Sequence, residues 1–165
     1  MVSDWPTVKL ADIVNFKTGK LDSNAAEENG SYPFFTCSPI TLSINTFAFE
    51  EEAVLLAGNN ANGVFAIKYF NGKFNAYQRT YVITPIDAKK VSVRWLYFRI
   101  KFVTAQLQRM AVGTATKFLT KKILDAFEIP LPPMHIQEEI ADMLWCLEDK
   151  IANNKQTNQT LEQMA

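Results

Sequence analysis

The 165-residue chain is poor in the residues that build catalytic and metal centres. It has one histidine, His135, and two cysteines, Cys37 and Cys146, far apart in the sequence. No group of His, Cys and carboxylate residues has the spacing of metal ligands, and no glycine-rich segment fits a phosphate cradle. The sequence therefore predicts a binding protein that is not an enzyme and has no cofactor or metal of its own.

Long apolar runs are also absent. No segment approaches the length of a membrane span, and the N-terminus lacks the basic and apolar regions of a signal peptide. Two distant cysteines favour a reducing compartment and are interpreted as buried thiols rather than a disulfide. These absences predict a cytoplasmic protein without a membrane partner.

Acidic residues are missing from the stretch between Lys89 and Lys122, which holds nine cations although the formal net charge of the chain is zero. Segregated charge of this kind favours an anionic partner. A solvated helix face with loop lysines would also explain it. Eight of these cations are the candidate contacts to DNA phosphates, namely Lys89, Lys90, Arg94, Lys101, Arg109, Lys117, Lys121 and Lys122.

Turn residues and apolar runs predict strands in the first half of the chain. Ala53–Ala57 is an apolar run with the composition of a buried strand, and it ends at Gly58. Asn71-Gly72 separates two strand-like runs, 64–70 and 73–83. Because Asn-Gly accepts positive φ angles at both central positions of a type I′ turn, the pattern predicts a β-hairpin there.

Helical periodicity begins after this region. Leu96, Ile100, Val103, Leu107 and Met110 are spaced four, three, four and three residues apart, which predicts an amphipathic helix over 93–110. A short helix capped by Thr120 and a final strand over 127–131 follow. The fold class is therefore predicted as α+β, with a β-rich, mixed domain over residues 1–133.

Glycine and proline are absent from His135 to Ala165, which predicts one long helix over residues 134–165, roughly 45 Å long at ~1.5 Å per residue. A heptad seam runs along it: Ile140, Leu144, Leu147, Ile151, Asn154, Asn158 and Leu161. The first two turns are expected to pack on the chain's own domain. The remaining length favours an intermolecular coiled coil, in which seam asparagines fix register at a cost in stability.

Polar side chains near the predicted turns are the candidates for reading DNA bases: Asn59, Asn60, Asn62, Gln78, Arg79, Thr114 and Thr116. Asn and Gln can bond adenine through both amide groups, and Arg can bond guanine through its planar fork. Local turn chemistry would also explain the asparagines, and a cross-strand ion pair would explain Arg79.

Four stretches of the chain resemble the DNA-specificity subunit of type I restriction–modification systems. They are residues 5–10 with Gly19-Lys20, residues 54–83, residues 113–121, and residues 129–139 followed by Asp149-Lys150-Ile151 and Leu161-Glu162. The last stretch is the most specific. A full subunit carries two domain-plus-helix units and this chain has one, so it resembles either a natural half-subunit or a fragment.

The resemblance implies a target recognition domain followed by a conserved-region helix, and a subunit that does no chemistry. Its partners would be double-stranded DNA, a second copy or the other half of the subunit, the modification (methyltransferase) subunits, which bind S-adenosylmethionine, and the restriction subunit. Two copies paired antiparallel would form a two-fold homodimer that reads an interrupted inverted repeat. The alternatives are a coiled-coil adaptor without sequence specificity, a small nuclease and a single-strand binder.

Overall fold

Strand β5 (Phe49–Ala57) lies at the centre of the fold because its apolar run is buried on both faces. In the computed structural model, which describes residues 4–164, β5 pairs antiparallel with β7 (Ile67–Ala76) on one side and with β8 (Thr80–Pro85) on the other. Successive side chains of a strand point to opposite faces. Val54 and Leu56 accordingly enter one apolar cluster, and Ala53 and Leu55 enter another.

The main sheet has six strands in the order β2-β8-β5-β7-β3-β4. All neighbouring pairs are antiparallel except β3 with β7, and two small sheets, β1-β10 and β6-β9, lie outside it. The remaining strands are β1 (Thr7–Lys9), β2 (Val14–Thr18), β3 (Tyr32–Phe35), β4 (Leu42–Ile44), β6 (Asn59–Asn60), β9 (Lys117–Phe118) and β10 (Glu128–Pro130). The short helices are α1 (Leu10–Ile13), a 3-10 turn at Ser23–Ala25, and α3 (Lys121–Ala126).

The predicted hairpin at Asn71-Gly72 is wrong. Strand β7 continues through both residues, with Asn71 opposite Glu52 and Gly72 opposite Glu51 on β5. The actual hairpin joins β5 to β7 through residues 58–66, and β8 crosses to the far side of β5. The local preference of Asn-Gly for a turn is overridden because the long ladder with β5 satisfies the backbone of β7 throughout. The glycine keeps an unusual φ of +142° within the strand.

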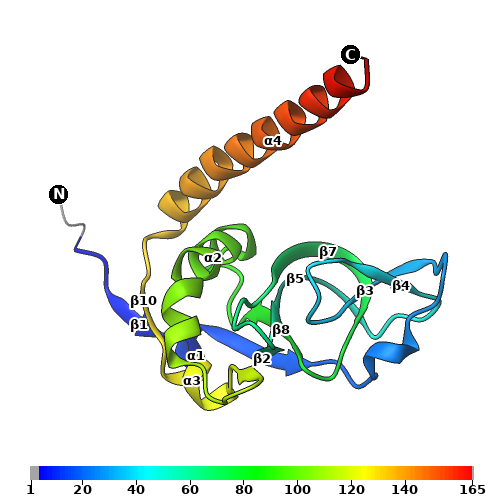
Figure 1. The fold of residues 1–165 in the computed structure, drawn as a ribbon. Coiled ribbons are helices and arrows are strands. Elements are labelled where there is room, and N and C mark those ends of the chain that lie inside the picture. The colour runs from blue at the N-terminus through cyan, green and yellow to red at the C-terminus, as the bar shows by residue number, and fades with distance from the viewer. Residues whose placement is uncertain (1–3, 165) are drawn as a thin grey trace.

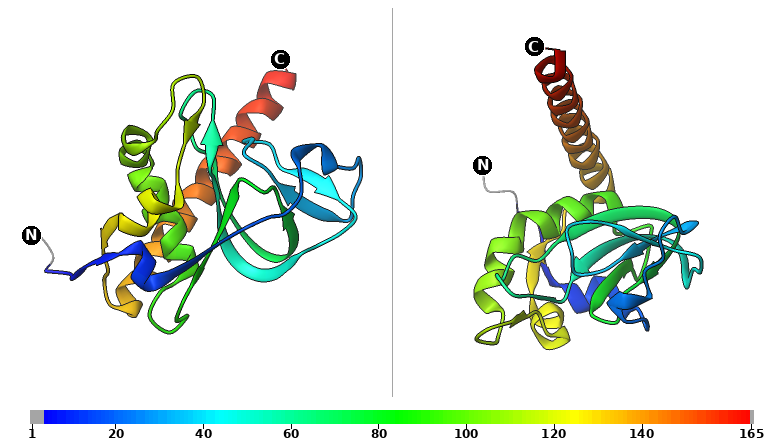
Figure 2. Two further views of the ribbon diagram at one scale, coloured as in Figure 1. Left: turned by 90° about the horizontal axis from the view of Figure 1, so that it is seen from below. Right: turned by 45° about the vertical axis from the view of Figure 1, so that its right-hand side comes forward.

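Helix α2 (Val93–Met110) covers one face of the sheet, and its bounds match the predicted ones (Figures 1 and 2). The hydroxyl of Ser92 caps it by accepting a hydrogen bond from the Trp95 backbone N–H. The apolar stripe from Leu96 to Leu107 is buried in the main core, whereas Met110 is 43% exposed. The stripe prediction is therefore wrong only at its last position, where the helix has passed the edge of the core.

Helix α4 (Met134–Met164) follows β10, packs its first turns on α2 and then projects away from the rest of the molecule (Figures 1 and 2). The buried side chain of Gln137 anchors it. This side chain accepts from the Ser92 backbone N–H at 2.9 Å and donates to the carbonyls of Lys90 and Pro132 at 2.9 and 2.8 Å. Ala141 is fully buried in the main core, so the first turns of α4 belong to the same packing unit as α2.

The predicted α+β class and the long C-terminal helix are confirmed. The interpretation of the cysteines as two buried thiols is wrong for Cys146, which is exposed on α4, while Cys37 is half-buried; both are free. Within residues 4–164, none of the helices is long and apolar enough to cross a bilayer.

Candidate nucleic-acid interface

Two loops that are distant in the sequence pair with each other beyond the C-terminal end of the central strand β5. The backbone of β6 pairs with β9, with Asn59 opposite Phe118 and Asn60 opposite Lys117. The Leu119 N–H donates to the Gly58 carbonyl at 2.8 Å and extends this pairing. The ladder therefore holds the asparagine loop against the loop that follows α2.

A third segment, the turn between β7 and β8, joins these two loops. Gln78 and Arg79 form this turn, so placing them on a hairpin strand is wrong. The Gly58 N–H donates to the Arg79 carbonyl at 2.8 Å, and a Cβ on Gly58 would lie only 2.5 Å from that oxygen. Residue 58 must therefore be glycine for the turn to approach so closely. The Arg79 guanidinium lies 5.7 Å from the Phe118 ring centroid.

We call the three segments, residues 58–63, 77–79 and 112–118, the loop cluster. A groove runs beside it, lined by Thr18, Gly58, Gln78, Arg79, Tyr81, Val112 and Phe118–Lys121. The Tyr81 hydroxyl donates to the Leu119 carbonyl at 2.8 Å. Burial, with a smaller contribution from Asp125, raises the pKa of Tyr81 above its ordinary value, so the phenol stays a neutral donor.

The seven candidate base-reading residues all lie in the loop cluster, but they are not equally free. Asn60 Oδ1 accepts from the Asn62 backbone N–H at 2.7 Å, which is the local turn chemistry considered above. Gln78 makes a long, 3.4 Å hydrogen bond to Asp22. The Oδ1 atom of Asn59 is buried and has no hydrogen-bond partner. The exposed members of the set are Asn62, Gln78, Arg79 and Thr114.

The candidate phosphate contacts divide into two groups. The first group lies beside the first turns of α4, which we call the root of the helix. Arg94 lies 2.8 Å from Asp142 and 3.6 Å from Glu138, and Lys101 pairs with Glu148. Acids that are absent from the basic stretch are thus supplied by α4. Lys90 in the preceding loop lies 4.0 Å from Asp87. Arg94 and Lys101 therefore help to hold the first turns of α4 against α2. We call this contact between the two helices the seat of α4.

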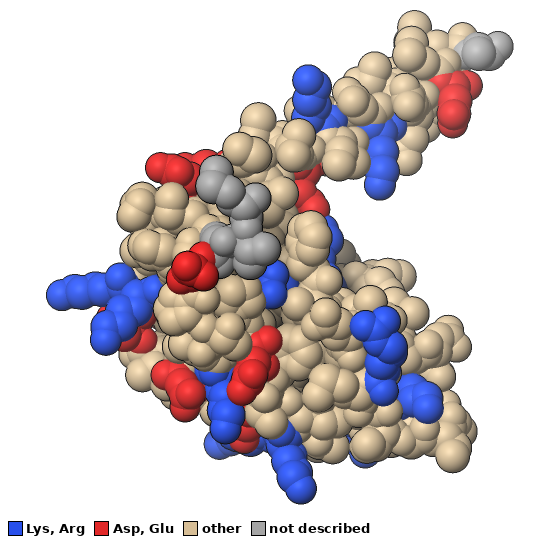
Figure 3. Space-filling view, turned by 90° about the vertical axis from the view of Figure 1, so that its left-hand side faces the viewer, with Lys and Arg blue, Asp and Glu red and all other residues tan. Residues whose placement is uncertain are grey.

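The second group lies at and beyond the C-terminal end of α2. Lys117 donates to the Gly113 carbonyl at 2.6 Å, and Lys121 pairs with Asp125 at 2.6 Å. Arg109 and Lys122 are exposed and make no ion pair with any described residue. On the face drawn in Figure 3, acids are interspersed with the cations. The acid-free stretch from Lys89 to Lys122 therefore does not form one continuous basic surface.

Comparison with known proteins identifies the family. Residues 2–163 match the family described as "Type I restriction modification DNA specificity domain". The chain belongs to this family. It is 41% identical over 161 residues to the type I restriction enzyme EcoDI specificity subunit of Escherichia coli, covering 98% of this chain and 34% of that subunit. It is 26% identical to the MjaVIII specificity subunit of Methanocaldococcus jannaschii, covering 93% and 38%.

Solved structures support the same fold. A type I restriction-modification S subunit from M. genitalium superimposes with a TM-score of 0.79 at 17% identity, covering 91% of this chain and 40% of that one. The HsdS subunit from Thermoanaerobacter tengcongensis gives 0.64 at 20% identity, covering 95% and 40%. The chain thus spans about two fifths of these structures. Specificity subunits are the non-catalytic, DNA-recognising components of type I systems, and within residues 4–164 no cluster of His, Cys, Asp and Glu could hold a metal.

An aromatic cluster fixes the root of α4 on this specificity domain. The Trp145 ring stacks on Tyr97 at 5.5 Å between centroids and meets Tyr69 and Phe98 edge-on, each at 5.1 Å. The Tyr69 hydroxyl donates to Glu52 on β5 at 2.6 Å. Burial and then this hydrogen bond raise the pKa of Tyr69 well above its ordinary value. Periodicity alone does not reveal this cluster, because its members come from separate elements.

The predicted seam of the specificity domain divides into two parts. Ile140 and Leu144 pack against the protein's own core, as expected for the first two turns. Leu147, Ile151 and Leu161 are 51%, 54% and 59% exposed, and every described residue from 151 onward is exposed. The second half of α4 thus presents an exposed stripe, in which Ile151 and Leu161 flank Asn154 and Asn158, without an intramolecular partner among the described residues.

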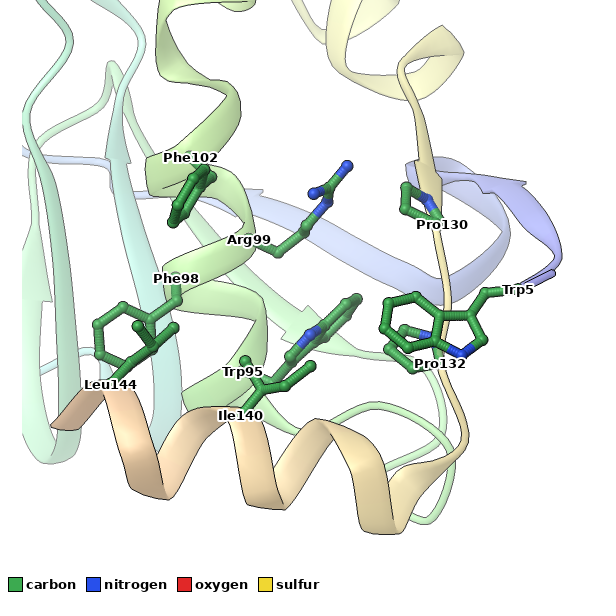
Figure 4. A pocket seen from close by; sticks show the side chains of 9 residues that line it. All are labelled: Trp5, Trp95, Phe98, Arg99, Phe102, Pro130, Pro132, Ile140 and Leu144. Carbon is green, nitrogen blue, oxygen red and sulfur yellow. The ribbon is translucent and has the colours of Figure 1, made fainter. Parts of the chain in front are cut away.

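Two apolar hollows lie along α4, one beside its docked first turns and one beside the start of the exposed stripe. One, of about 170 Å³, lies among Trp5, α2, Pro130, Pro132 and the start of α4, with Arg99 on its wall (Figure 4). Burial lowers the pKa of Arg99, whose Nε atom is buried without a partner. The other hollow continues along α4 and is lined by Phe98, Lys101, Phe102, Leu144, Leu147, Glu148 and Ile151. Phe102, which is 77% exposed, borders both.

Proposed function

We propose that this specificity domain reads one part of a bipartite duplex DNA target through the loop cluster. The observation that carries the proposal is the convergence of three sequence-distant polar segments beside one groove, held there by backbone pairing. Side chains on loops held by a rigid sheet can vary without disturbing the fold, as sequence reading requires.

Base contact is assigned to the exposed side chains Asn62, Gln78, Arg79 and Thr114, with Asn59, Asn60 and Thr116 supporting them. Lys117 belongs to the loop cluster, Lys121 lines the groove beside it, and Arg109 and Lys122 lie within a few residues of the cluster along the chain. These four cations are therefore assigned to phosphates. Arg94 and Lys101 are assigned instead to the seat of α4, because their charges are matched by acids of that helix. Lys89 and Lys90 lie at the same, N-terminal end of α2.

The division into a recognition domain (1–133) and a conserved-region helix (134–165) gives α4 a separate role. Its exposed stripe pairs antiparallel with the equivalent helix of a second copy or of the other half of a subunit, and α4 also docks the methyltransferase and restriction subunits. The pairing would hold two recognition domains at opposite ends of a spacer. An adaptor role without DNA specificity is the second candidate, favoured only by the exposed stripe.

Selection of bound sequences from random duplex DNA, with a methyltransferase subunit present, tests the proposal. We expect enrichment of one short motif, repeated in inverted orientation when two copies bind. Gln78→Ala and Arg79→Ala are expected to change the enriched sequence, whereas Arg109→Ala is expected to weaken binding to all sequences alike. If the two sets of variants caused the same uniform loss, the assignment of base-reading residues would be wrong.

A further inference from the structure

The α4 seam contains two asparagines among apolar residues. Only one antiparallel register of two such helices places asparagine opposite asparagine and apolar residues opposite each other. The alternating spacing of four and three reads the same in both directions, so two copies can align in registers that differ by one heptad. We propose that Asn154 of one copy faces Asn158 of the other, and that this pairing sets the register. The inference rests on the self-association of α4 proposed above.

In this Asn-matched register, Ile151 faces Leu161 of the second copy, and both Asn layers lie at the centre. Every seam asparagine then meets an asparagine, which can donate and accept at once. In the register shifted by one heptad towards the root, Leu147 faces Asn158 and Ile151 faces Asn154. That arrangement leaves each amide opposite an aliphatic side chain, without a partner.

The burial of the first seam residues supports the same choice. The shifted register would need Leu144 to face Leu161 of the second copy, yet Leu144 is already half-buried by its packing on the protein's own core. The Asn-matched register uses the exposed residues Ile151 and Leu161.

Surface charge favours the shifted register, but weakly. There, Glu148 would lie near Lys155 of the second copy, whereas the Asn-matched register brings the two Lys155 side chains near each other. Glu148 already pairs with Lys101 within its own chain. Exposed ion pairs contribute less than an unpaired amide costs in a desolvated seam, so the asparagines decide.

Register has a functional consequence for the spacing of the two recognition domains. A shift of one heptad changes their separation by about 10 Å, which is about three base pairs of duplex. Asn154 and Asn158 are therefore specificity-determining residues for the length of the spacer, although they lie far from the loop cluster.

Exchange between two single variants of the full chain tests the pairing. In the Asn-matched register, an Asn154→Leu homodimer and an Asn158→Leu homodimer each contain two Asn–Leu layers. The mixed dimer contains one Leu–Leu and one Asn–Asn layer. In native mass spectrometry of equal mixtures, one variant isotopically labelled, the ratio of mixed dimers to homodimers should therefore exceed the statistical ratio of about one by more than about tenfold. Statistical mixing would overturn the register, because the shifted alignment gives the mixed dimer no advantage.

The native thiol Cys146 supplies an independent distance. With Cys37→Ser, spin labels on Cys146 of two copies should be offset along the helices by about 30 Å in the Asn-matched register and about 20 Å in the shifted one. The shorter distance would overturn the register and leave the self-association intact. A chain that stays monomeric at every concentration would overturn the self-association itself, and with it the register.

Discussion

The two ends of helix α2 carry cations in different surroundings. At the N-terminal end and in the middle of the helix, Arg94 and Lys101 are paired with acids of α4. At the C-terminal end, Arg109 has no ion-pair partner among the described residues, and the neighbouring loops present polar side chains beside a groove. Residues of one type, on one helix, thus lie in two settings: one group holds α4 in place, and the other is the group proposed to contact DNA phosphates.

The seat of α4 depends most on one buried side chain, so Gln137→Leu should have the largest effect. It removes three hydrogen bonds and leaves the Ser92 N–H and two carbonyls buried without partners. We expect a loss of about 2–4 kcal/mol in the free energy of unfolding, measured by urea denaturation. Gln163→Leu, the same change at an exposed position of the same helix, should stay within about 0.5 kcal/mol. Equal effects would show that the anchor contributes nothing specific.

The salt dependence of DNA binding should distinguish the cations at the two ends of α2. Arg109→Ala combined with Lys122→Ala should reduce the slope of log affinity against log salt by about two, because each phosphate contact contributes about 0.9. Arg94→Ala is the matched change at the other end, and we expect an unaltered slope. Titration of duplex DNA by fluorescence anisotropy at several salt concentrations measures both. A reduced slope for Arg94→Ala would return that residue to the phosphate set.

The seat of α4 should weaken in alkali. Burial and the bond to Glu52 raise the pKa of Tyr69 above its ordinary value of 10.0, so the folded state holds this proton more tightly than the unfolded state. The pKa of Lys101 is also raised: burial lowers it, but the hydrogen bond to Glu148 and nearby charges outweigh that effect. The stability from both groups is complete below about pH 10 and is lost as the pH rises further.

Urea denaturation from pH 8 to pH 11 measures this loss, with tryptophan fluorescence, to which Trp145 contributes together with Trp5 and Trp95, as the probe. Tyr69→Phe is the matched control, because it keeps the ring against Trp145 and removes the titrating hydroxyl. The variant should be less stable at neutral pH and less sensitive to alkali. An alkaline slope equal to that of the native protein would exclude Tyr69 as its source.

The smallest effect is expected at Cys146, which lies on the exposed side of the docked part of α4. Cys146→Ser should change the free energy of unfolding by less than about 0.5 kcal/mol. In the native protein, a thiol reagent should modify Cys146 quickly and the half-buried Cys37 slowly, as mass spectrometry of the labelled peptides would show. Slow modification of both thiols would support the original interpretation of Cys146 as buried.

Local patterns in the sequence determined the elements that depend on local physics. The period of the apolar stripe defined α2, the absence of glycine and proline defined α4, and Thr120 caps α3 as its position suggested. The same reasoning failed at Asn71-Gly72, where a local turn preference competed with a long-range strand ladder. Strand pairing joins residues that are distant in the chain, and no local pattern reports it.

The seam spacing, the family and the set of polar loop residues were therefore determined by the sequence itself. Only the tertiary structure decided which cations are neutralised by α4, which half of the seam is covered, and that residues near positions 60, 78 and 116 share one surface. The physical reason is that charge pairing, burial and groove formation depend on distances through space. The backbone pairing of β6 with β9 and the seating of α4 on α2 set those distances.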